Sequence, residues 1–514
     1  MKMKLNYKRT IFVGFAFFLI SLFWQAYDTI IPKILTDKFG MNQSWSGVIM
    51  AVDNVLALFL LPLFGNLSDK CKSKSGRRTP FIKIGTILAV CFLLLLTFAD
   101  TLQLKQLSAV APTEPAAQEI LYDADLTFRT PDGEEIVLQD KFSKTEYTAI
   151  TMFDENGKTT EAYTDYVVPA RQAYAAALTA ANQTPLIVFV ALLFCLLLSM
   201  STFRSPAVAL MPDVTIKPLR SKGNAVINLM GALGGITVLV LGMVFGTGKA
   251  QNALMSYGSF FACIGALMLI ALLLFLWQVK EPQFVKDMEE ESARLGLDTA
   301  PDTPEEEAGF TKAELAEKSG KEKMPKEKLV SLLLILASVV LWYLGYNAVT
   351  SKYSVYASSV LNLDYNMTLT IASAAAIVSY LPVGFIASKV GRRKTILAGV
   401  LMLGAAFGAA SFMRAGSSAL VMNALFVLAG MGWATINVNS YPMVVELCQG
   451  DQMGKYTGFY YTASMAAQTL TPVLSGILMD KLGMTVLFPY GSLFVLAAFA
   501  TMFFVKHGDN KPTA

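Results

Sequence analysis

The chain has 514 residues, of which 54% are apolar and 16% charged, and its net charge is +4. Soluble domains carry roughly 45 to 50% apolar and about 25% charged residues, so this composition indicates a membrane protein and excludes a soluble multidomain enzyme. No segment combines dense Lys and Arg with aromatic residues, which argues against a nucleic-acid partner. The single histidine is His507. We therefore expect no His-based metal site, no catalytic triad and no cofactor.

Twelve apolar segments follow one another along the chain, each of about the length that a membrane-spanning helix needs. The first begins after a basic N-terminus, as a signal peptide does, but it has no small-residue cleavage site and therefore predicts a retained helix. The sequence thus predicts an all-α membrane protein with helices near residues 11–35, 45–65, 80–99, 185–204, 224–246, 253–278, 329–351, 366–387, 394–413, 418–442, 456–479 and 484–505.

Two long polar segments interrupt this pattern. Residues 280–328 hold 14 acidic and 9 basic residues and include Pro301, Pro304 and Pro325, which is typical of a flexible, partly helical linker. Residues 100–185 hold 14 acidic and 6 basic residues. Within them, LTFR-TPDG-EEIVL and ITMF-DENG-KTTEAY each place two β-rich runs around an Asp-Gly or Asn-Gly turn, the strongest short hairpin signal. We expect a small β-rich domain in this insertion.

Basic residues collect before the first helix and after the second, fourth and eighth helices. Cytoplasmic loops are enriched in Lys and Arg, so these loops and both termini are predicted to be cytoplasmic, in the cell membrane, with the insertion outside. The predicted organisation is 1–99 (helices 1–3), 100–185 (extracytoplasmic insertion), 186–279 (helices 4–6), 280–328 (cytoplasmic linker), 329–505 (helices 7–12) and 506–514 (cytoplasmic tail).

The two halves repeat each other. The offset between matching residues drops from 319 to 236 for the pair Pro206 and Pro442, and this drop of 83 residues is close to the 86-residue length of the insertion. The insertion therefore belongs to the first half alone. Parallel six-helix halves point to a transporter that rocks around a midplane site. At the offset of 319, Tyr27, Asp28 and Lys33 recur as Tyr346, Asn347 and Lys352.

Two loops at matching positions share a pattern. Residues 65–81 read GNLSDKCKSKSGRRTPF and residues 384–395 read GFIASKVGRRKT. A Gly-x-x-x-acid-basic pattern followed by Gly-Arg-Arg resembles the loop signature of the major facilitator superfamily, although Ser388 replaces the acid of the second copy. Carboxylate and guanidinium groups that pair in one state and separate in the other would form a cytoplasmic gate, with Asp69 pairing with Arg204; alternatively, the arginines only fix orientation. The gate residues are Gly65, Asp69, Gly76, Arg77, Arg78, Arg204, Gly384, Gly391, Arg392, Arg393 and Glu446.

Within that superfamily the chain most resembles the glycoside-pentoside-hexuronide cation symporters and the proton-coupled sucrose transporter group. The resemblance rests on FWQAYDTIIP in the first helix, Asp53-Asn54 in the second, RSPAVALMPD after the fourth and NSYPMVVEL after the tenth. It implies a sugar as the solute. The acidic residues that melibiose-permease-like symporters carry near the proline of helix 2 are replaced here by Ala57 and Leu61, so a proton is favoured over sodium.

Asp28 and Asp53 are the two ionisable residues well inside predicted spans, and such residues are functional by default. From the 1.5 Å rise per helical residue, they lie about 10 Å and about 12 Å from the outer surface. Two neighbouring carboxylates in a low dielectric do not easily ionise together, so we expect Asp28 to bind the proton and sugar hydroxyls and Asp53 to tune it. Stacking and hydroxyl-binding residues complete the predicted site, although each taken singly is explained by packing: Trp24, Gln25, Tyr27, Asn54, Tyr346, Asn347, Trp433, Asn437 and Gln468.

The sequence therefore predicts a secondary transporter, not an enzyme, that imports a sugar or related polar solute with protons. Two alternatives remain. A proton-driven exporter is disfavoured because the fifth helix, with GALGG at residues 231–235, lacks the Gly-Pro pair typical of drug-proton antiporters. A membrane receptor that binds ligand through the insertion is disfavoured because the gate loops are duplicated.

Overall fold

The long helices follow the predicted apolar segments. The structure, a computed structural model, describes residues 5–155, 157–216, 219–295, 325–447 and 453–508. In this part of the chain, ten helices are long and apolar enough to cross a membrane. They are α1 (Tyr7–Lys33) with the π-helical turn η1 (Ile34–Lys38), α2 (Gln43–Asp69), α3 (Thr79–Leu107), α8 (Thr184–Asp213), α9 (Arg220–Phe245), α10 (Gly258–Gln278), α14 (Lys326–Tyr356) with the π-helical turn η6 (Ala357–Leu361), α16 (Arg392–Ala410), α17 (Ala419–Glu446) and α19 (Leu487–Phe503).

Two further long helices, α15 (Tyr365–Val390) and α18 (Met453–Leu482), occupy the predicted segments 366–387 and 456–479. Neither is among the ten helices that meet the length and hydropathy requirements for a span. A topology of twelve spans therefore stays a prediction, whereas a mostly helical protein with many membrane-spanning helices is what the structure shows.

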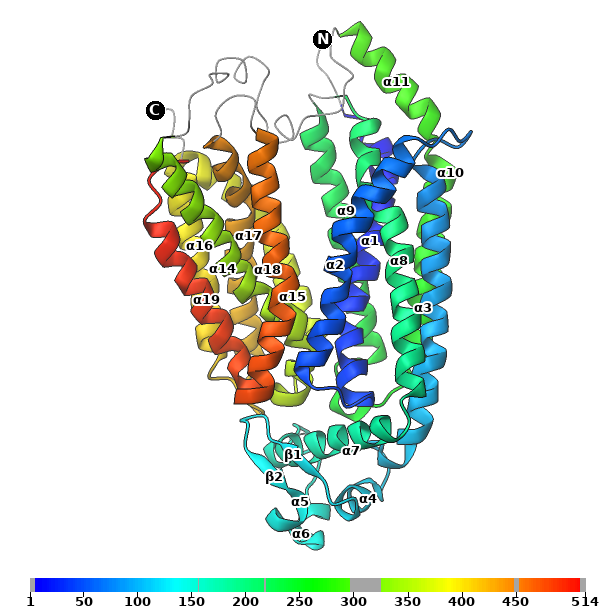
Figure 1. Ribbon diagram of the computed structural model, residues 1–514, viewed down its shortest axis with the longest axis vertical. Coiled ribbons are helices and arrows are strands. Elements are labelled where there is room, and N and C mark those ends of the chain that lie inside the picture. Colours follow the sequence, from blue (N-terminus) through cyan, green and yellow to red (C-terminus); the bar gives the residue numbers. More distant parts are fainter. Residues whose placement is uncertain (1–4, 156, 217–218, 296–324, 448–452, 509–514) are drawn as a thin grey trace.

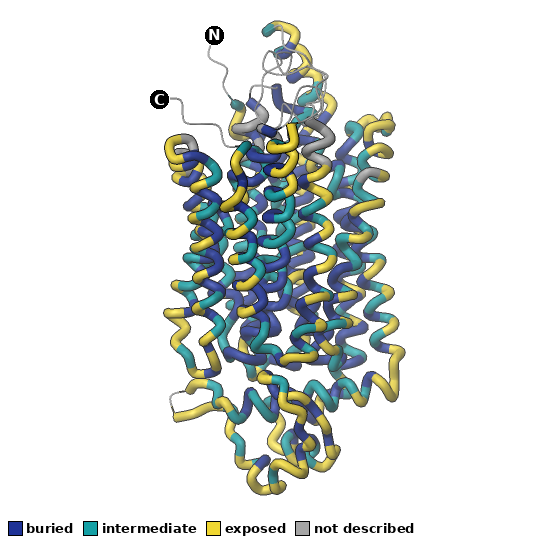
Figure 2. Tube along the Cα trace, turned by 60° about the vertical axis from the view of Figure 1, so that its left-hand side comes forward, coloured by how far each residue is buried: buried dark blue, intermediate teal, exposed yellow. Residues whose placement is uncertain are grey.

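The helices form two bundles, each with its own apolar core. One core is built from α1, α2, α3, α8, α9 and α10, and the other from α14 to α19. The bundles stand side by side, and most buried positions lie along their middle (Figures 1 and 2). They touch through α2 with α18 and through α9 with α15.

Glycines allow the backbones of the two bundles to approach closely at one end. A Cβ added at Gly47 of α2 would lie 2.1 Å from the carbonyl oxygen of Pro472 in α18, and a Cβ at Gly476 would lie 2.2 Å from that of Gln43. The ribbons converge toward the insertion and diverge toward the opposite end (Figure 1). The halves are therefore most tightly joined at the insertion end.

The prediction that the insertion is rich in β-strands is not confirmed. The first hairpin is confirmed, because β1 (Thr127–Arg129) pairs antiparallel with β2 (Glu135–Val137). The second predicted hairpin contributes a single bridge between Phe153 and Thr159. The remaining elements are the helices α4 (Ala117–Asp123), α5 (Leu138–Lys141), α6 (Lys144–Thr148) and α7 (Val168–Ala181) and the turns η2 (Ser108–Val110) and η3 (Tyr163–Val167).

Local sequence explains why helices dominate there. The Ser143 and Glu146 capping box starts α6, which follows the first hairpin and the short helix α5. The alanine-rich run of α7 has high helix propensity. The predicted turns form, but the runs of residues on either side of them pair as strands over only a short length. The insertion nevertheless has an apolar core of its own, which includes Leu138 and Tyr147.

Two helices continue beyond their predicted ends. α3 was expected to stop near residue 99 but reaches Leu107, because Asp100 is fully buried against Lys38 with an Nζ to Oδ1 distance of 2.5 Å. α8 was expected to stop near Arg204 but continues through Pro206 to Asp213. Prolines are tolerated inside membrane helices, where neighbouring groups satisfy the freed backbone, so Pro206 was misread as a helix end.

The insertion contacts both bundles. On the first bundle, the Gln172 amide donates to the Asp37 carboxylate over 3.0 Å. On the second, an Arg129 guanidinium nitrogen donates to the Asp480 carbonyl over 2.7 Å, and the Thr485 N–H donates to the Pro131 carbonyl over 3.2 Å. The linker begins with α11 (Glu281–Arg294), and its predicted flexible middle, 296–324, lies outside the described residues.

Candidate functional site

The predicted carboxylates occupy the middle of the first bundle. Asp28 lies on α1, which packs against α8, α9, α10 and α14. Its neighbours Tyr27 and Thr29 are buried, whereas Asp28 itself is solvent-accessible. Asp53 lies on α2, half-buried, and accepts a hydrogen bond from the Asn54 amide over 3.0 Å. The carboxylates of Asp28 and Asp53 are near enough to interact electrostatically.

Arg204 of α8 joins this group. Its guanidinium lies 5.0 Å from the Trp24 ring centre on α1, and it interacts electrostatically with both Asp28 and Asp53. The prediction that Arg204 ends a helix is wrong, since α8 continues to Asp213. Its pairing with Asp69 when the cytoplasmic side is shut stays a prediction. We call Trp24, Tyr27, Asp28, Asp53 and Arg204 the charged cluster.

A second group lies in the other bundle. The rings of Tyr346 on α14 and Trp433 on α17 stack in parallel, with their centres 3.6 Å apart and their planes 2° apart. Tyr343 meets the same indole edge-on at 5.3 Å. Asn437 is exposed and hydrogen-bonded to Tyr380 of α15. We call Tyr343, Tyr346, Tyr380, Trp433 and Asn437 the aromatic cluster. Tyr380 was not among the residues predicted from the sequence.

Several buried polar atoms at these clusters have no hydrogen-bond partner among the described residues. They are Trp24 Nε1, Tyr27 Oη and Asn347 Nδ2. A buried donor left unpaired costs about 1 to 3 kcal/mol, and a polar solute that reached these atoms would recover this free energy. Gln25 of α1 lies beside Gly235 of α9, where its Oε1 would be 3.5 Å from an added Cβ. Among the described residues, no hydrogen bond or ring contact connects Gln468 to either cluster.

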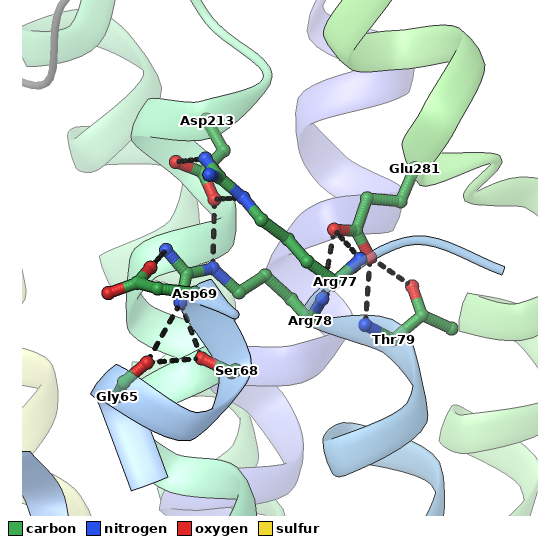
Figure 3. A network of polar contacts seen from close by, with 8 residues as sticks. All are labelled: Gly65, Ser68, Asp69, Arg77, Arg78, Thr79, Asp213 and Glu281. Carbon is green, nitrogen blue, oxygen red and sulfur yellow. Dashed lines mark hydrogen bonds and ion pairs between the residues drawn. The ribbon is translucent and has the colours of Figure 1, made fainter. Parts of the chain in front are cut away.

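A network of charged groups joins α2, α3 and α8 at the end opposite the insertion (Figure 3). Arg78 pairs with Asp69 at 2.5 Å and with Asp213 at 2.9 Å, and Arg77 pairs with Asp213 at 2.7 Å. Arg78 also donates to the Ser68 hydroxyl and to the Gly65 carbonyl. In this structure Asp69 contacts the loop that follows its own helix, through Arg78.

Glu281, the first residue of α11, also belongs to this network and was not among the residues predicted from the sequence. Its buried carboxylate accepts hydrogen bonds from the backbone N–H groups of Arg77, Arg78 and Thr79 over 2.8 to 2.9 Å and from the Thr79 hydroxyl over 2.7 Å. Gly76 has φ +110°, and a Cβ there would lie 2.2 Å from Glu281 Oε2. Only glycine fits this position.

The matching loop of the second half is tied differently. Gly391 again has a positive φ of +96°. Arg393 donates to the carbonyls of Met502 and Phe503 at the end of α19. Gly384 is exposed. The Glu446 side chain lies outside the described residues, so its predicted pairing with Arg392 or Arg393 stays a prediction.

Family comparisons agree with this architecture. A family model described as Major Facilitator Superfamily matches residues 172–472 and again 356–514. A second, described as MFS/sugar transport protein, matches residues 12–109. The chain is 42% identical over 50 residues to the sucrose transport protein SUC4 of Arabidopsis thaliana. That match spans 10% of this chain and 10% of the relative.

Solved structures share the fold at low identity. The inward open xylose transporter XylE of E. coli has a TM-score of 0.58 at 12% identity, over 98% of this chain and 97% of that one. A bacterial homologue of the iron transporter ferroportin in an inward-facing state has a TM-score of 0.57 at 11% identity, over 97% and 99%. A D-xylose-proton symporter has a TM-score of 0.57 at 13% identity, over 98% and 99%.

Proposed function

The chain belongs to the Major Facilitator Superfamily, and we propose that it is a secondary transporter that imports a sugar or related polyol with protons by alternating access. The observation that carries the proposal is that α1, which holds part of the charged cluster, packs against α14 of the other bundle, which holds part of the aromatic cluster. Sequence similarity to a sucrose transport protein over 50 residues, and the match to a sugar-transport family model, support a sugar as the solute.

The two clusters offer complementary chemistry to a sugar. Trp433 and Tyr346 stack in two parallel planes and cover each other's inner faces, so it is an outer face of this pair that suits the apolar face of a pyranose ring. The carboxylate of Asp28, the amide of Asn437 and the unpaired donors of Tyr27 and Asn347 suit its hydroxyls. A solute held between the bundles would contact both halves.

Charge balance within the charged cluster supports proton coupling. Asp28, Asp53 and Arg204 together carry one net negative charge when both carboxylates are ionised, and no net charge when one carboxyl is protonated. A neutral cluster is the form that a low-dielectric interior favours. Binding one proton therefore allows the loaded site to change its access. The metal-ligating acids that sodium would need near Pro62 are replaced by Ala57 and Leu61.

The side of closure follows from the contacts between the bundles. Their close backbone contacts lie at the insertion end, and the ribbons diverge at the end of the basic loops. We assign the insertion to the outside and the basic loops and termini to the cytoplasm, because cytoplasmic loops carry Lys and Arg. In this assignment the structure is an inward-facing state of the cycle, with residues 100–185 as the outer domain.

Uptake by proteoliposomes tests the proposal. Labelled mono- and disaccharides are offered with an imposed pH gradient, with an imposed sodium gradient, or with neither. We expect one sugar class to accumulate under the pH gradient alone. Asp28→Asn should retain exchange of solute across the membrane but lose accumulation, and Asp53→Asn should shift the pH at which accumulation is greatest.

Asp140→Asn is the matched control, since it neutralises an exposed carboxylate of the insertion. It should accumulate sugar as the unaltered protein does. Sodium-driven accumulation would contradict the proton assignment, and wild-type accumulation by Asp28→Asn would remove that residue from the coupling site. Outward movement against the gradient would identify an exporter.

A further inference from the structure

Two lysines singled out by the internal repeat have no part in the clusters described above. Lys33 and Lys352 occupy equivalent positions in the repeat: Lys33 is the last residue of α1, directly before η1, and Lys352 lies near the end of α14, which continues into η6. Both are buried, with 2% and 0% of their surface exposed. A buried ammonium is costly unless it is paired, so each lysine must have a compensating partner.

Each lysine finds a partner in the opposite bundle. Lys33 Nζ donates to the Ser358 hydroxyl of η6 over 2.8 Å and also pairs with Asp37 of its own helix at 3.2 Å. Lys352 Nζ donates to the Gln43 carbonyl, at the start of α2, over 2.8 Å. The lysines therefore cross between the halves in opposite directions, as the pseudo-twofold repeat requires.

The start of α2 is held from a second side. Asp480, near the end of α18, accepts hydrogen bonds from the N–H groups of Gln43 and Ser44, each over 2.8 Å, and from the Ser44 hydroxyl. A carboxylate at a helix N-terminus also interacts favourably with the helix dipole. Asp480 and Lys352 of one bundle thus hydrogen-bond to the same turn of α2 in the other bundle.

We propose that Lys33, Lys352 and Asp480 form a clasp that closes the insertion side of the transporter and sets how often that side opens. They are positioning residues, since none belongs to the charged or the aromatic cluster. The inference rests on the proposed alternating access, because the halves must part at this end for the opposite state to form.

Both contacts favour the closed form. Removing one partner of a buried charged contact leaves the other partner uncompensated, which is strongly destabilising. Lys352→Met takes the donor from the Gln43 carbonyl and the nearby positive charge from Asp480, so the open form should gain. Asp480→Asn removes the negative charge at the α2 N-terminus, so the open form should gain in this variant too.

Thiol accessibility measures which side is open, in protein whose native cysteines have been replaced. Ser46→Cys reports the insertion side, because Ser46 is completely buried on the first turn of α2. Gly384→Cys reports the other end, where Gly384 is exposed. We expect Lys352→Met to accelerate the reaction of the Ser46→Cys reporter with an impermeant maleimide at least fivefold. Asp480→Asn should accelerate it at least fivefold and slow the Gly384→Cys reporter.

Lys249→Met is the matched control, since Lys249 is an exposed lysine at the same end, and it should change neither rate. Ser44→Ala removes one donor to Asp480 and should shift both reporters in the direction of Asp480→Asn, but less. These rates are measured without solute, so failure to transport a sugar leaves them interpretable. Unchanged rates in Lys352→Met and Asp480→Asn, or faster reaction of both reporters in both variants, would overturn the clasp.

Discussion

Glu281 offers a quantitative test of how the basic loop after α2 is held. Its carboxylate accepts three backbone N–H groups and one hydroxyl at the start of α3, and the residue is 1% exposed. Glu281→Gln keeps the shape but removes the charge. A charge-assisted hydrogen bond is worth about 1 kcal/mol more than a neutral one, so loss of the charge over two or three bonds should cost about 2 to 3 kcal/mol.

Amide hydrogen exchange at the N–H groups of Arg77, Arg78 and Thr79 measures this loss of free energy directly. A tenfold change in an opening equilibrium corresponds to about 1.4 kcal/mol, so these amides should exchange about 30- to 100-fold faster in Glu281→Gln. Glu289→Gln, an exposed residue on the same helix α11, is the control and should leave them unchanged. Unaltered exchange in Glu281→Gln, or equal acceleration in both variants, would refute this reasoning.

Three further predictions concern the insertion and the solute site. Burial and nearby acids raise the pKa of Asp165 to about 6. Between about pH 4 and about pH 6 the folded insertion therefore binds a proton that the unfolded chain does not. The resistance of the insertion to proteolysis should fall as the pH rises through about 6, and Asp165→Asn should remove this pH dependence. Gly157→Cys should react with an impermeant thiol reagent on intact cells while Cys71 does not, and the reverse would invert the orientation. Trp433→Ala should raise the KM for sugar about threefold to tenfold, since aromatic contacts are worth about 0.5 to 1.5 kcal/mol, whereas Trp433→Phe should retain the wild-type value.

Hydropathy predicted the helices well because a bilayer demands long apolar runs whatever their tertiary partners. It predicted helix ends less well, since those depend on contacts made in the fold. Asp100 looks like the start of a polar loop until Lys38 is known to lie beside it. Pro206 looks like a helix end, yet α8 continues for a further seven residues to Asp213.

The candidate site was predicted in part. Counting ionisable residues within spans selected Asp28 and Asp53, which the structure brings near each other. Arg204 was predicted at a helix end, whereas α8 continues to Asp213, and its contact with Trp24 depends on the packing of α8 against α1. Glu281 carried no local signal, since its partners at the start of α3 lie some 200 residues away. The repeat did place Lys33 and Lys352 at equivalent positions, but their crossing contacts come from the packing of two bundles.

The attachment of the insertion has a pharmacological consequence. It is covalently joined to α3 and α8 of the first bundle, yet it contacts the second bundle through Arg129 and Pro131. When the bundles tilt, it must travel with the first and slide over the rim of the second. An antibody fragment or macrocycle wedged at that seam would arrest or bias the cycle without entering the membrane. Selectivity against relatives without an insertion would then come from its surface rather than from the solute site.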